Sequence, residues 1–399
     1  MPHREIKMHP ESAPSILLDA LATAAEDASF QPLVAGVRQV LASVGIRPDR
    51  IQLPMTRQGG FRHPTLGLVV MTWCHDRAYG ESFSVPHTAV EAADVPVQTP
   101  YRYMFDNQLG HLRIDLERVP PGLEMPIFVE LRSRGYRDYA AFKLPMPGNT
   151  TQVLSLASLD SLPADLLTRI AATLPLIGLS TYAAYRTSQA QQLASTYIGP
   201  RSGPQVLAGD IRRGSTGRMV AGILFCDIRG FTALSEREAP ETVVQMINEV
   251  FERVEAEATQ HNGEILKFIG DAMLLVFPSE QRTIADVAHD IIETTTKTLA
   301  AIERSALPIG IRIGATIGEV VRGNIGTPER LDFTVMGTAV NLASRLEGLC
   351  RPLEAPALFC ASIAAHVPTL QHVGDHPLKG IRNPVAVYRL PEASEVTAP

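Results

Sequence analysis

Residues 220–349 carry apolar patterns of two different periods in a fixed order, and this order constrains the fold more than any other feature. Runs that alternate or stay apolar over a few residues predict strands, whereas repeats near 3.6 residues predict helices. The pieces are a strand, a helix, a hairpin, a helix, a strand and a helix, at residues 220–226, 242–258, 265–277, 284–302, 309–313 and 338–349. This order predicts an α+β domain with helices covering one face of a sheet.

The rest of the chain predicts a second domain and a connection between the two. Helical patterning over residues 15–45 comes first. Short β-like runs follow at residues 66–73, 109–116, 127–131, 139–144 and 152–156. A Leu- and Ala-rich helical stretch at 164–196 precedes residues 197–217, which hold seven glycines and prolines and read as a linker or ordered hinge. We therefore expect domains at residues 1–160 and 218–392, joined by a signalling linker at residues 161–217.

The composition excludes some function classes. The chain of 399 residues is 45% hydrophobic and 20% charged, which is ordinary for a globular protein. Its formal net charge of -6 argues against a nucleic-acid binder, since such proteins usually carry a basic face. A nucleotide substrate is not excluded, because it needs only a local group of cations.

The expected location is the cytoplasm. Four cysteines lie at positions without metal-type spacing, as in a reduced protein, and the N-terminus lacks the apolar stretch of a signal peptide. Residues 170–185 are the most apolar stretch, but they are shorter than the roughly 20 residues of a membrane span. We interpret this stretch as a packed or dimerising helix and expect no membrane span.

Two acids lie where the predicted strands end. Asp227 follows a buried strand, and Asp271 lies at the tip of the predicted hairpin. Carboxylates at adjacent strand ends are suited to hard cations such as Mg²⁺, which also take phosphate oxygens as ligands. Taken singly, each residue is more simply explained as a helix cap or a turn residue, and only their combination with other motifs favours chemistry.

Four motifs in sequence order supply that combination. They are FCDIRGFT, KFIGD, TVMGTAVNLASR and LKG, at residues 225–232, 267–271, 334–345 and 378–380. Together they resemble the catalytic domain of the class III adenylate and guanylate cyclases. The resemblance covers residues 218–390, and it implies a ferredoxin-like βαββαβ core.

The resemblance also implies a role for each matched residue. Asp227, Ile228 and Asp271 correspond to the positions that hold two Mg²⁺ or Mn²⁺ ions per active site. The substrate-binding set is Lys267 and Thr334 for the purine, Lys379 for the triphosphate, and Phe231 and Thr232. Asn341 corresponds to the residue that orients the ribose, and Arg345 to the one that stabilises the transition state at the α-phosphate. Because Asn341 and Arg345 are four apart on a predicted helix, they share a face.

The family works as a head-to-tail dimer, which makes the association of two chains part of catalysis. The metal-binding acids come from one subunit and the other site residues come from its partner. Lys267 and Asp271 are only four residues apart, yet the resemblance assigns them to different active sites. We therefore expect a homodimer with two interfacial sites.

The purine-reading pair favours ATP over GTP. Lysine with a hydroxyl matches the edge of adenine, whereas guanylate cyclases of the family usually carry an acid and a small Cys-like residue at these positions. Threonine at position 334 resembles the subgroup that includes bicarbonate-responsive cyclases. A guanylate cyclase and a catalytically silent ligand-sensing regulator remain as alternatives. A diguanylate cyclase does not, since its Gly-Gly-Asp/Glu-Glu-Phe signature is missing from the sequence.

Residues 1–160 give less information about function. Their pattern is GAF-like and resembles the N-terminal sensor regions of bacterial cyclases, so a small-molecule effector is a possible partner. His63, His75 and His87 are candidates for binding haem or a metal, although ordinary histidines are the simpler explanation. Trp73, with the aromatic residues of segment 101–105, is a candidate lining of a ligand pocket, although a plain core is the favoured interpretation.

Overall fold

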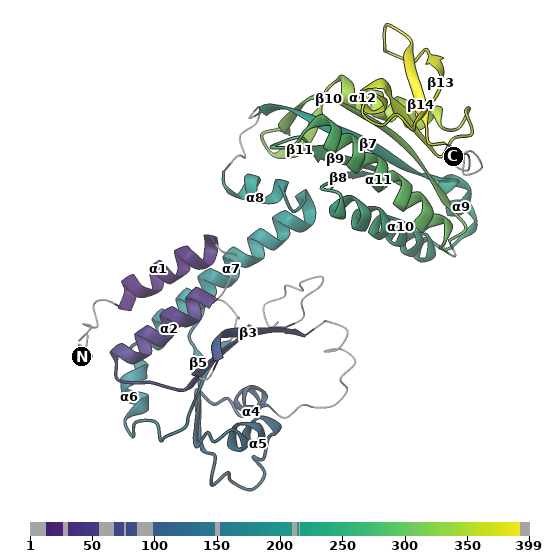
Figure 1. Ribbon diagram of the computed structural model, residues 1–399. Helices are drawn as coiled ribbons and strands as arrows, with labels where there is room; N and C mark the ends of the chain where they lie inside the picture. The colour runs from purple at the N-terminus through teal and green to yellow at the C-terminus, as the bar shows by residue number, and fades with distance from the viewer. Residues whose placement is uncertain are drawn as a thin grey trace. The chain divides into compact units, whose positions relative to one another are not determined.

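The chain divides into two compact units, Met1–Gln192 and Leu193–Pro399. The computed structural model describes residues 13–26, 31–55, 68–75, 77–85, 99–147, 152–209, 214, 216–305 and 307–391. Helix α7, Leu174–Ile198, runs across the boundary between the units (Figure 1). Each unit has its own sheet and its own hydrophobic cores.

The first unit is built on a six-stranded sheet in which every strand pair is antiparallel. The strands, in the order in which they lie in the sheet, are β3 (Arg77–Val85), β2 (Leu68–Cys74), β1 (Arg50–Met55), β6 (Gln152–Ser158), β5 (Asp138–Leu144) and β4 (His111–Asp115). Its helices are α1 (Ala13–Glu26), α2 (Gln31–Ser43), α4 (Pro100–Asp106), α5 (Pro126–Ser133), α6 (Leu166–Ala171) and α7.

Side-chain alternation along the strands gives this sheet two buried faces. In β5, Ala140 and Phe142 face a core shared with α1, α2, α6 and α7. Tyr139 and Ala141 face the opposite core, which they share with α4 and α5. Successive strand residues point to opposite faces, so one strand contributes to both cores.

One strand prediction for the first unit was wrong, and the plain core favoured for Trp73 and the aromatic residues of segment 101–105 agrees with the structure. The run at residues 127–131 is helix α5, since Pro126 starts the helix and Phe128 and Leu131 are buried at helical spacing. Trp73 packs against the core that contains α1 and α2, whereas Tyr101, Tyr103 and Phe105 pack against the core on the other face. Trp73 and these aromatics therefore do not line one pocket.

The second unit contains an eight-stranded sheet. The strands on its main path are, in spatial order, β13 (Gln371–His376), β14 (Val385–Arg389), β12 (Ala357–Cys360), β10 (Gly310–Thr327), β7 (Thr216–Arg229), β9 (Ala272–Pro278) and β8 (Glu264–Ile269). Strand β11, Arg330–Met336, pairs with the far end of β10. The helices are α8 (Ser202–Leu207), α9 (Phe231–Arg237), α10 (Pro240–Gln260), α11 (Ile284–Glu303), α12 (Thr338–Leu349) and α13 (Ala361–Ala364).

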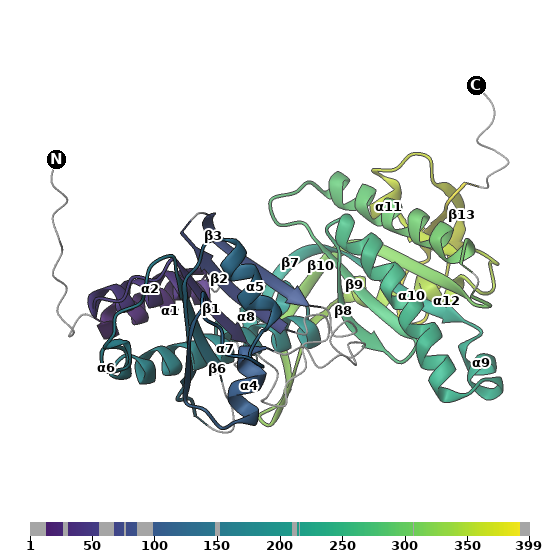
Figure 2. The same cartoon turned by 90° about the horizontal axis from the view of Figure 1, so that it is seen from below.

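Strands β7, β8, β9 and β10 with helices α10 and α11 form a βαββαβ unit, as the sequence predicted (Figure 2). The strand order within it is fourth, first, third, second, with β7 pairing antiparallel to both β10 and β9. The β8–β9 hairpin turns at Gly270-Asp271, where Gly270 has φ +65°, a conformation that glycine adopts without strain.

The expectation that helices cover one face of this sheet holds for α10 and α11 but fails for α12. Leu224 and Cys226 of β7 pack toward α10 and α11, whereas Ala221 and Ile223 pack toward α12. Gly314 of β10 makes this second layer possible. A Cβ there would lie 2.3 Å from the carbonyl oxygen of Ala343, so only glycine lets α12 approach the sheet so closely.

Across the described part of the chain, no helix has both the length and the apolar character that a membrane crossing needs.

Candidate active site

Asp227 and Asp271 lie together at the ends of neighbouring strands. Asp227 lies near the end of strand β7 and is paired with Ala272, the first residue of β9. Asp271 directly precedes Ala272 in the chain. Both side chains are half-buried. Burial raises the pKa of the Asp227 carboxyl, and the negative charge of Asp271 raises it further. The two charges thus repel each other, which favours a shared cation.

Arg312 and Glu347 join this site, although the motifs did not indicate them. Arg312 of β10 is paired in register with Asp227, and its charge lowers the pKa of the Asp227 carboxyl. Its Nη1 atom lies 3.9 Å from Oε1 of Glu347 on α12. Burial and the charge of Asp227 raise the pKa of Glu347 to about 7. Arg312 is a charged residue within the apolar run 309–313, but the sequence does not show that this run pairs with the strand of Asp227.

The donor set fits a hard divalent cation that keeps open positions. Within the described residues, no group of three or more His, Cys, Asp or Glu side chains forms a closed metal cluster. Mg²⁺ is usually held by one or two carboxylates together with waters and substrate phosphates, and Asp227 and Asp271 provide that number of carboxylates. Ile228 can contribute only its backbone, since its side chain is 2% exposed and lies in the core.

Phe231 and Thr232 open helix α9, directly after the strand that carries Asp227. Gly230, with φ +76°, makes the turn between strand and helix. Phe231 is half-buried against the core shared with α10, and Thr232 is exposed. These two residues therefore follow Asp227 along a sharp turn at the same end of the sheet.

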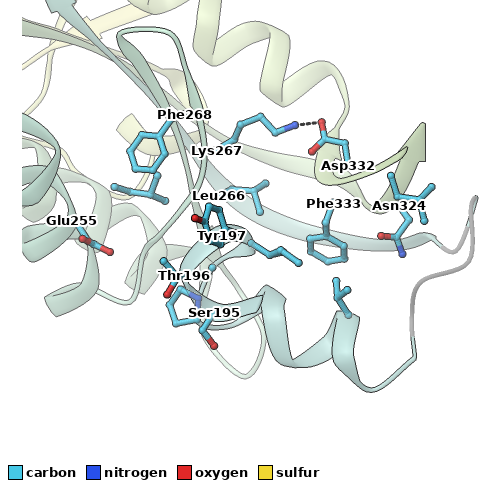
Figure 3. A pocket seen from close by; sticks show the side chains of 16 residues that line it. Ser195, Thr196, Tyr197, Glu255, Leu266, Lys267, Phe268, Asn324, Asp332 and Phe333 are labelled. Atoms are coloured by element: carbon cyan, nitrogen blue, oxygen red, sulfur yellow. Dashed lines mark hydrogen bonds and ion pairs between the residues drawn. The ribbon is translucent and has the colours of Figure 1, made fainter. Parts of the chain in front are cut away.

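Lys267 and Thr334 lie on different strands, β8 and β11. The Lys267 ammonium group forms an ion pair with Asp332, two residues before Thr334 on β11 (Figure 3). Asp332 and Thr334 are on the same side of this strand because side chains alternate. Lys267 and Asp332 also line a cavity of about 470 Å³ with Phe268, Phe333 and Tyr197. The structure thus gives Lys267 an acidic neighbour that the motifs did not indicate.

Asn341, Arg345 and Lys379 are exposed. Asn341 and Arg345 lie one helical turn apart on α12, as predicted, and Lys379 follows strand β13. Among the described residues, no hydrogen bond or ion pair joins Lys267, Thr334, Asn341, Arg345 or Lys379 to either aspartate. One chain therefore presents two groups of candidate residues that are not linked by direct polar contacts.

Other predicted or unusual positions lie away from these groups. Thr316 is buried, and its Oγ1 atom lies 2.8 Å from Sγ of Cys360. His75 is exposed, and its ring lies edge-on to Tyr136. His63 and His87 fall outside the described residues.

The segment between α7 and α8 is fixed to the strand that carries Lys267. Glu264, the first residue of β8, is 6% exposed, and its Oε1 atom accepts hydrogen bonds from the backbone N–H groups of Arg201 and Ser202. Gly199 has φ +115°, and a Cβ there would lie 2.0 Å from the same Oε1 atom. The Arg322 guanidinium also donates to the Ser202 hydroxyl at 3.2 Å.

Residues 217–384 match the family model described as the adenylate and guanylate cyclase catalytic domain. The similarity to this family therefore lies within the second unit. All ten predicted site residues lie within the match. Residues 1–160 lie outside it.

Curated relatives match part of the chain. Adenylate cyclase 1 of Rhizobium meliloti is 31% identical over 180 residues, covering 42% of this chain and 27% of the relative. The adenylate cyclase of Anabaena cylindrica is 32% identical over 164 residues, covering 40% of this chain and 32% of the relative. The match thus spans about a third or less of the length of these relatives.

Solved structures also align with part of the chain. The adenylyl cyclase CyaB from P. aeruginosa is 26% identical, with a TM-score of 0.41, covering 45% of this chain and 97% of that chain. The guanylyl cyclase Cya2 is 27% identical, with a TM-score of 0.39, covering 45% and 96%.

Proposed function

We propose that this protein is an adenylate cyclase that converts ATP into 3′,5′-cyclic AMP and pyrophosphate. The observation that carries the proposal is the meeting of Asp227 and Asp271 at adjacent strand ends within a cyclase catalytic domain. Their mutual repulsion fits a site that binds divalent cations together with a triphosphate. The named adenylate cyclases of Rhizobium and Anabaena support the choice of reaction class.

In this proposal Asp227 and Asp271 hold two Mg²⁺ or Mn²⁺ ions, with the backbone of Ile228 completing the set. Such ions, when bound, lower the pKa of the ribose 3′-hydroxyl and offset the charge of the triphosphate. Arg312 lies beside Asp227 and adds a fixed positive charge near the phosphates.

The exposed face of α12 acts on the ribose and the α-phosphate. Asn341 orients the ribose, so that the 3′-oxygen forms its new bond to the α-phosphorus. Arg345 donates to the phosphoryl oxygens as negative charge builds there, which a planar, permanently charged fork does well. The bond from the α-phosphorus to the bridging oxygen breaks, and Lys379 binds the departing pyrophosphate. The hydroxyl proton leaves to solvent.

Lys267 and Thr334 read the purine and favour adenine. The ammonium group donates to a ring nitrogen, and the hydroxyl accepts from the exocyclic amine. Asp332, which pairs with Lys267, adds a carboxylate acceptor on the same side of β11. Phe231 and Thr232 line the substrate on the metal-binding side. A guanylate cyclase is the second candidate, since the family model that matches residues 217–384 describes both adenylate and guanylate cyclases.

The active enzyme is a homodimer with two interfacial sites. Two observations support this proposal. The purine-reading residues make no direct polar contact with the metal-binding acids of the same chain. In addition, Phe268 and Ile269 are 55% and 46% exposed beside Lys267, and Met336 is 47% exposed beyond Thr334. Exposed apolar side chains grouped around a polar site are typical of an interaction surface.

Residues 1–160 form a GAF-like sensor domain in this account, and residues 161–217 connect it to the catalytic domain in a cytoplasmic enzyme. The six-stranded antiparallel sheet with helices on both faces is compatible with that role. The bonds between Glu264 and the α7–α8 segment supply a physical connection to the strand that carries Lys267.

Turnover of ATP and GTP by the purified chain tests the proposal. With Mg²⁺ or Mn²⁺ we expect cyclic AMP from ATP and at least tenfold less cyclic GMP from GTP. Asp271→Asn is expected to abolish both activities, whereas Asp160→Asn, at an exposed position of the first unit, keeps them. Faster turnover of GTP would favour a guanylate cyclase, and no turnover of either would favour a silent regulator.

An unchanged initial rate on adding bicarbonate at clamped pH would exclude bicarbonate activation.

A further inference from the structure

The first unit contains a group of polar side chains buried at the centre of its sheet. We call it the Arg50 cluster, and its members are Arg50, Gln52, Thr72, Tyr101, Tyr139 and Ser155. Gln52 on β1 is paired in register with Thr72 on β2 and with Ser155 on β6, so three adjacent strands place polar side chains on one face. Helix α4 brings Tyr101 over the same face.

Hydrogen bonds connect the neutral members of the cluster. The Tyr101 hydroxyl donates to Oε1 of Gln52 at 3.0 Å and lies 3.1 Å from Oγ of Ser155. Nε2 of Gln52 donates to Oγ1 of Thr72 at 3.3 Å. Burial raises the pKa of Tyr101, and that of Tyr139 more strongly, so both hydroxyls stay protonated near neutral pH. The cluster therefore consists of neutral groups around one cation.

That cation is Arg50, and among the side chains that the structure describes no acid compensates its charge. The residue is 6% exposed, and its only hydrogen bond within the described residues is from Nη1 to Oε1 of Gln52, at 3.4 Å. The Nε atom is buried and has no hydrogen-bond partner. Among the side chains that the structure describes, no carboxylate lies within ion-pair distance of the guanidinium group.

An uncompensated buried arginine is unusual, because a charge removed from water is normally paired with an opposite charge. The ion pair between the exposed Arg113 and the buried Asp138 of the same sheet shows the contrast. Arg113 binds Asp138, which is 6% exposed, through Nη2 at 2.6 Å and Nε at 3.3 Å. The same sheet thus pairs one arginine with a buried acid and leaves Arg50 facing hydroxyls and an amide.

We propose that the Arg50 cluster binds a small organic molecule through an anionic oxygen group, a carboxylate or a phosphoryl group. The guanidinium fork binds that group, and the hydroxyls of Tyr101, Tyr139 and Ser155 donate to its remaining oxygens. Arginine is suited to both groups because its planar donors match two oxygens at once. This proposal does not depend on the catalytic activity assigned to the second unit.

The first test is anion binding by the full chain, with acetate and inorganic phosphate as probes and chloride at matched ionic strength as the reference. Thermal unfolding of the wild type is expected to shift upward and saturate with at least one probe. The probe that saturates at the lower concentration identifies the group as carboxylate or phosphoryl. The expected dissociation constant rises at least tenfold in Arg50→Gln and is unchanged in Arg118→Gln, which removes an exposed arginine of the same unit.

Two further variants separate binding from a structural role. Without probe, Arg50→Gln is expected to be at least as stable as the wild type, since it removes an uncompensated buried charge. A structural arginine would give a less stable variant instead. Tyr101→Phe keeps the ring and removes the hydroxyl, and it is expected to weaken probe binding about threefold or more. The proposal is overturned if neither probe gives saturable stabilisation, or if Arg50→Gln binds as well as the wild type.

Discussion

The two units of this chain use similar sheets but place their charged side chains in opposite ways. In the second unit the candidate site residues lie at strand ends, in turns and on the open face of α12, where most of them are half-buried or exposed. In the first unit Arg50 is the first residue of β1, and its polar neighbours on β1, β2, β5, β6 and α4 gather on one largely buried face of the sheet. The first arrangement suits a large substrate shared with a second chain. The second suits a small molecule that becomes enclosed.

The two units also differ in the charges that surround a buried ionisable side chain. Glu347 in the second unit faces Arg312 and two aspartates, so its environment contains both signs of charge. Arg50 in the first unit faces only neutral groups among the described residues. A site that will bind cations therefore already holds excess negative charge, and a site that will bind an anion holds a single positive one. Each unit is incomplete without its ligand.

Removal of one strand-end acid is expected to have the largest effect. Asp227→Ala should lower cyclase activity by at least about 100-fold, because the site loses half of its carboxylate ligands. Circular dichroism should show an unchanged fold, since the residue is half-buried at the end of β7. Activity within a few-fold of wild type would mean that the strand-end acids of the second unit are turn residues.

Glu347→Gln tests the excess negative charge of the same site. The pKa of Glu347 is raised from its ordinary value of 4.5 to about 7 in the folded state. Between these pH values the folded chain therefore binds more protons than the unfolded chain, and the unfolding free energy falls as the pH rises. Glu347→Gln has no carboxyl group at this position, so its unfolding free energy does not fall for this reason. In EDTA it should exceed the wild type by about 2–3 kcal/mol in unfolding free energy above pH 7, with no difference below pH 4.5. Glu303→Gln, at an exposed acid on α11, is the control; equal pH profiles for Glu347→Gln and wild type would contradict the assignment.

Glu264→Ala tests the connection between the helical segment and the strand that carries Lys267. Two backbone N–H groups lose a buried acceptor, which should cost about 1–3 kcal/mol of stability. Glu264→Gln keeps an acceptor and should lose less, and Glu252→Ala, at an exposed position of α10, should lose almost nothing. Chemical denaturation measures all three. Equal stability of Glu264→Ala and Glu252→Ala would show that this connection is not formed.

The smallest effect is expected at the partially exposed ion pair of Lys267. Asp332→Asn removes the charge of the partner but keeps its size, and such pairs contribute about 1 kcal/mol or less. The KM for ATP should therefore change by less than about tenfold while kcat stays within about threefold. Steady-state kinetics with ATP and GTP measure both. A large loss of kcat with unchanged KM would place Asp332 in the chemical step instead of the purine site.

The sequence predicted the second unit well because each of its elements carries one clear period. The helix expected at 242–258 is α10, Pro240–Gln260, and the hairpin turns at Gly270-Asp271 as expected. The face covered by α12 was not predictable from period alone. It depends on Gly314, whose missing Cβ admits the helix, and an isolated glycine in a strand has several explanations.

The first unit was harder to predict because both faces of its sheet are buried. Strand β6 is buried at every position, which hides the alternation that marks a half-exposed strand. Residues 127–131 had a β-like composition, yet Pro126 starts a helix there. The Arg50 cluster was not predictable, since its members come from four strands and one helix far apart in sequence. In the second unit, Arg312 and Glu347 were missed for the same reason: only the register of β7 with β10 brings Arg312 to Asp227.

Complementation between two inactive chains tests the central claim most directly. Asp227→Ala and Arg345→Ala chains carrying different tags would be co-expressed, and the mixed dimer purified through both tags. One site of this dimer keeps the acids of one chain and the α12 face of the other, so we predict about half of the wild-type rate of cyclic AMP formation from a purified mixed dimer. Each variant alone should be inactive. A purified mixed dimer as inactive as its parents would contradict an active site divided between two chains.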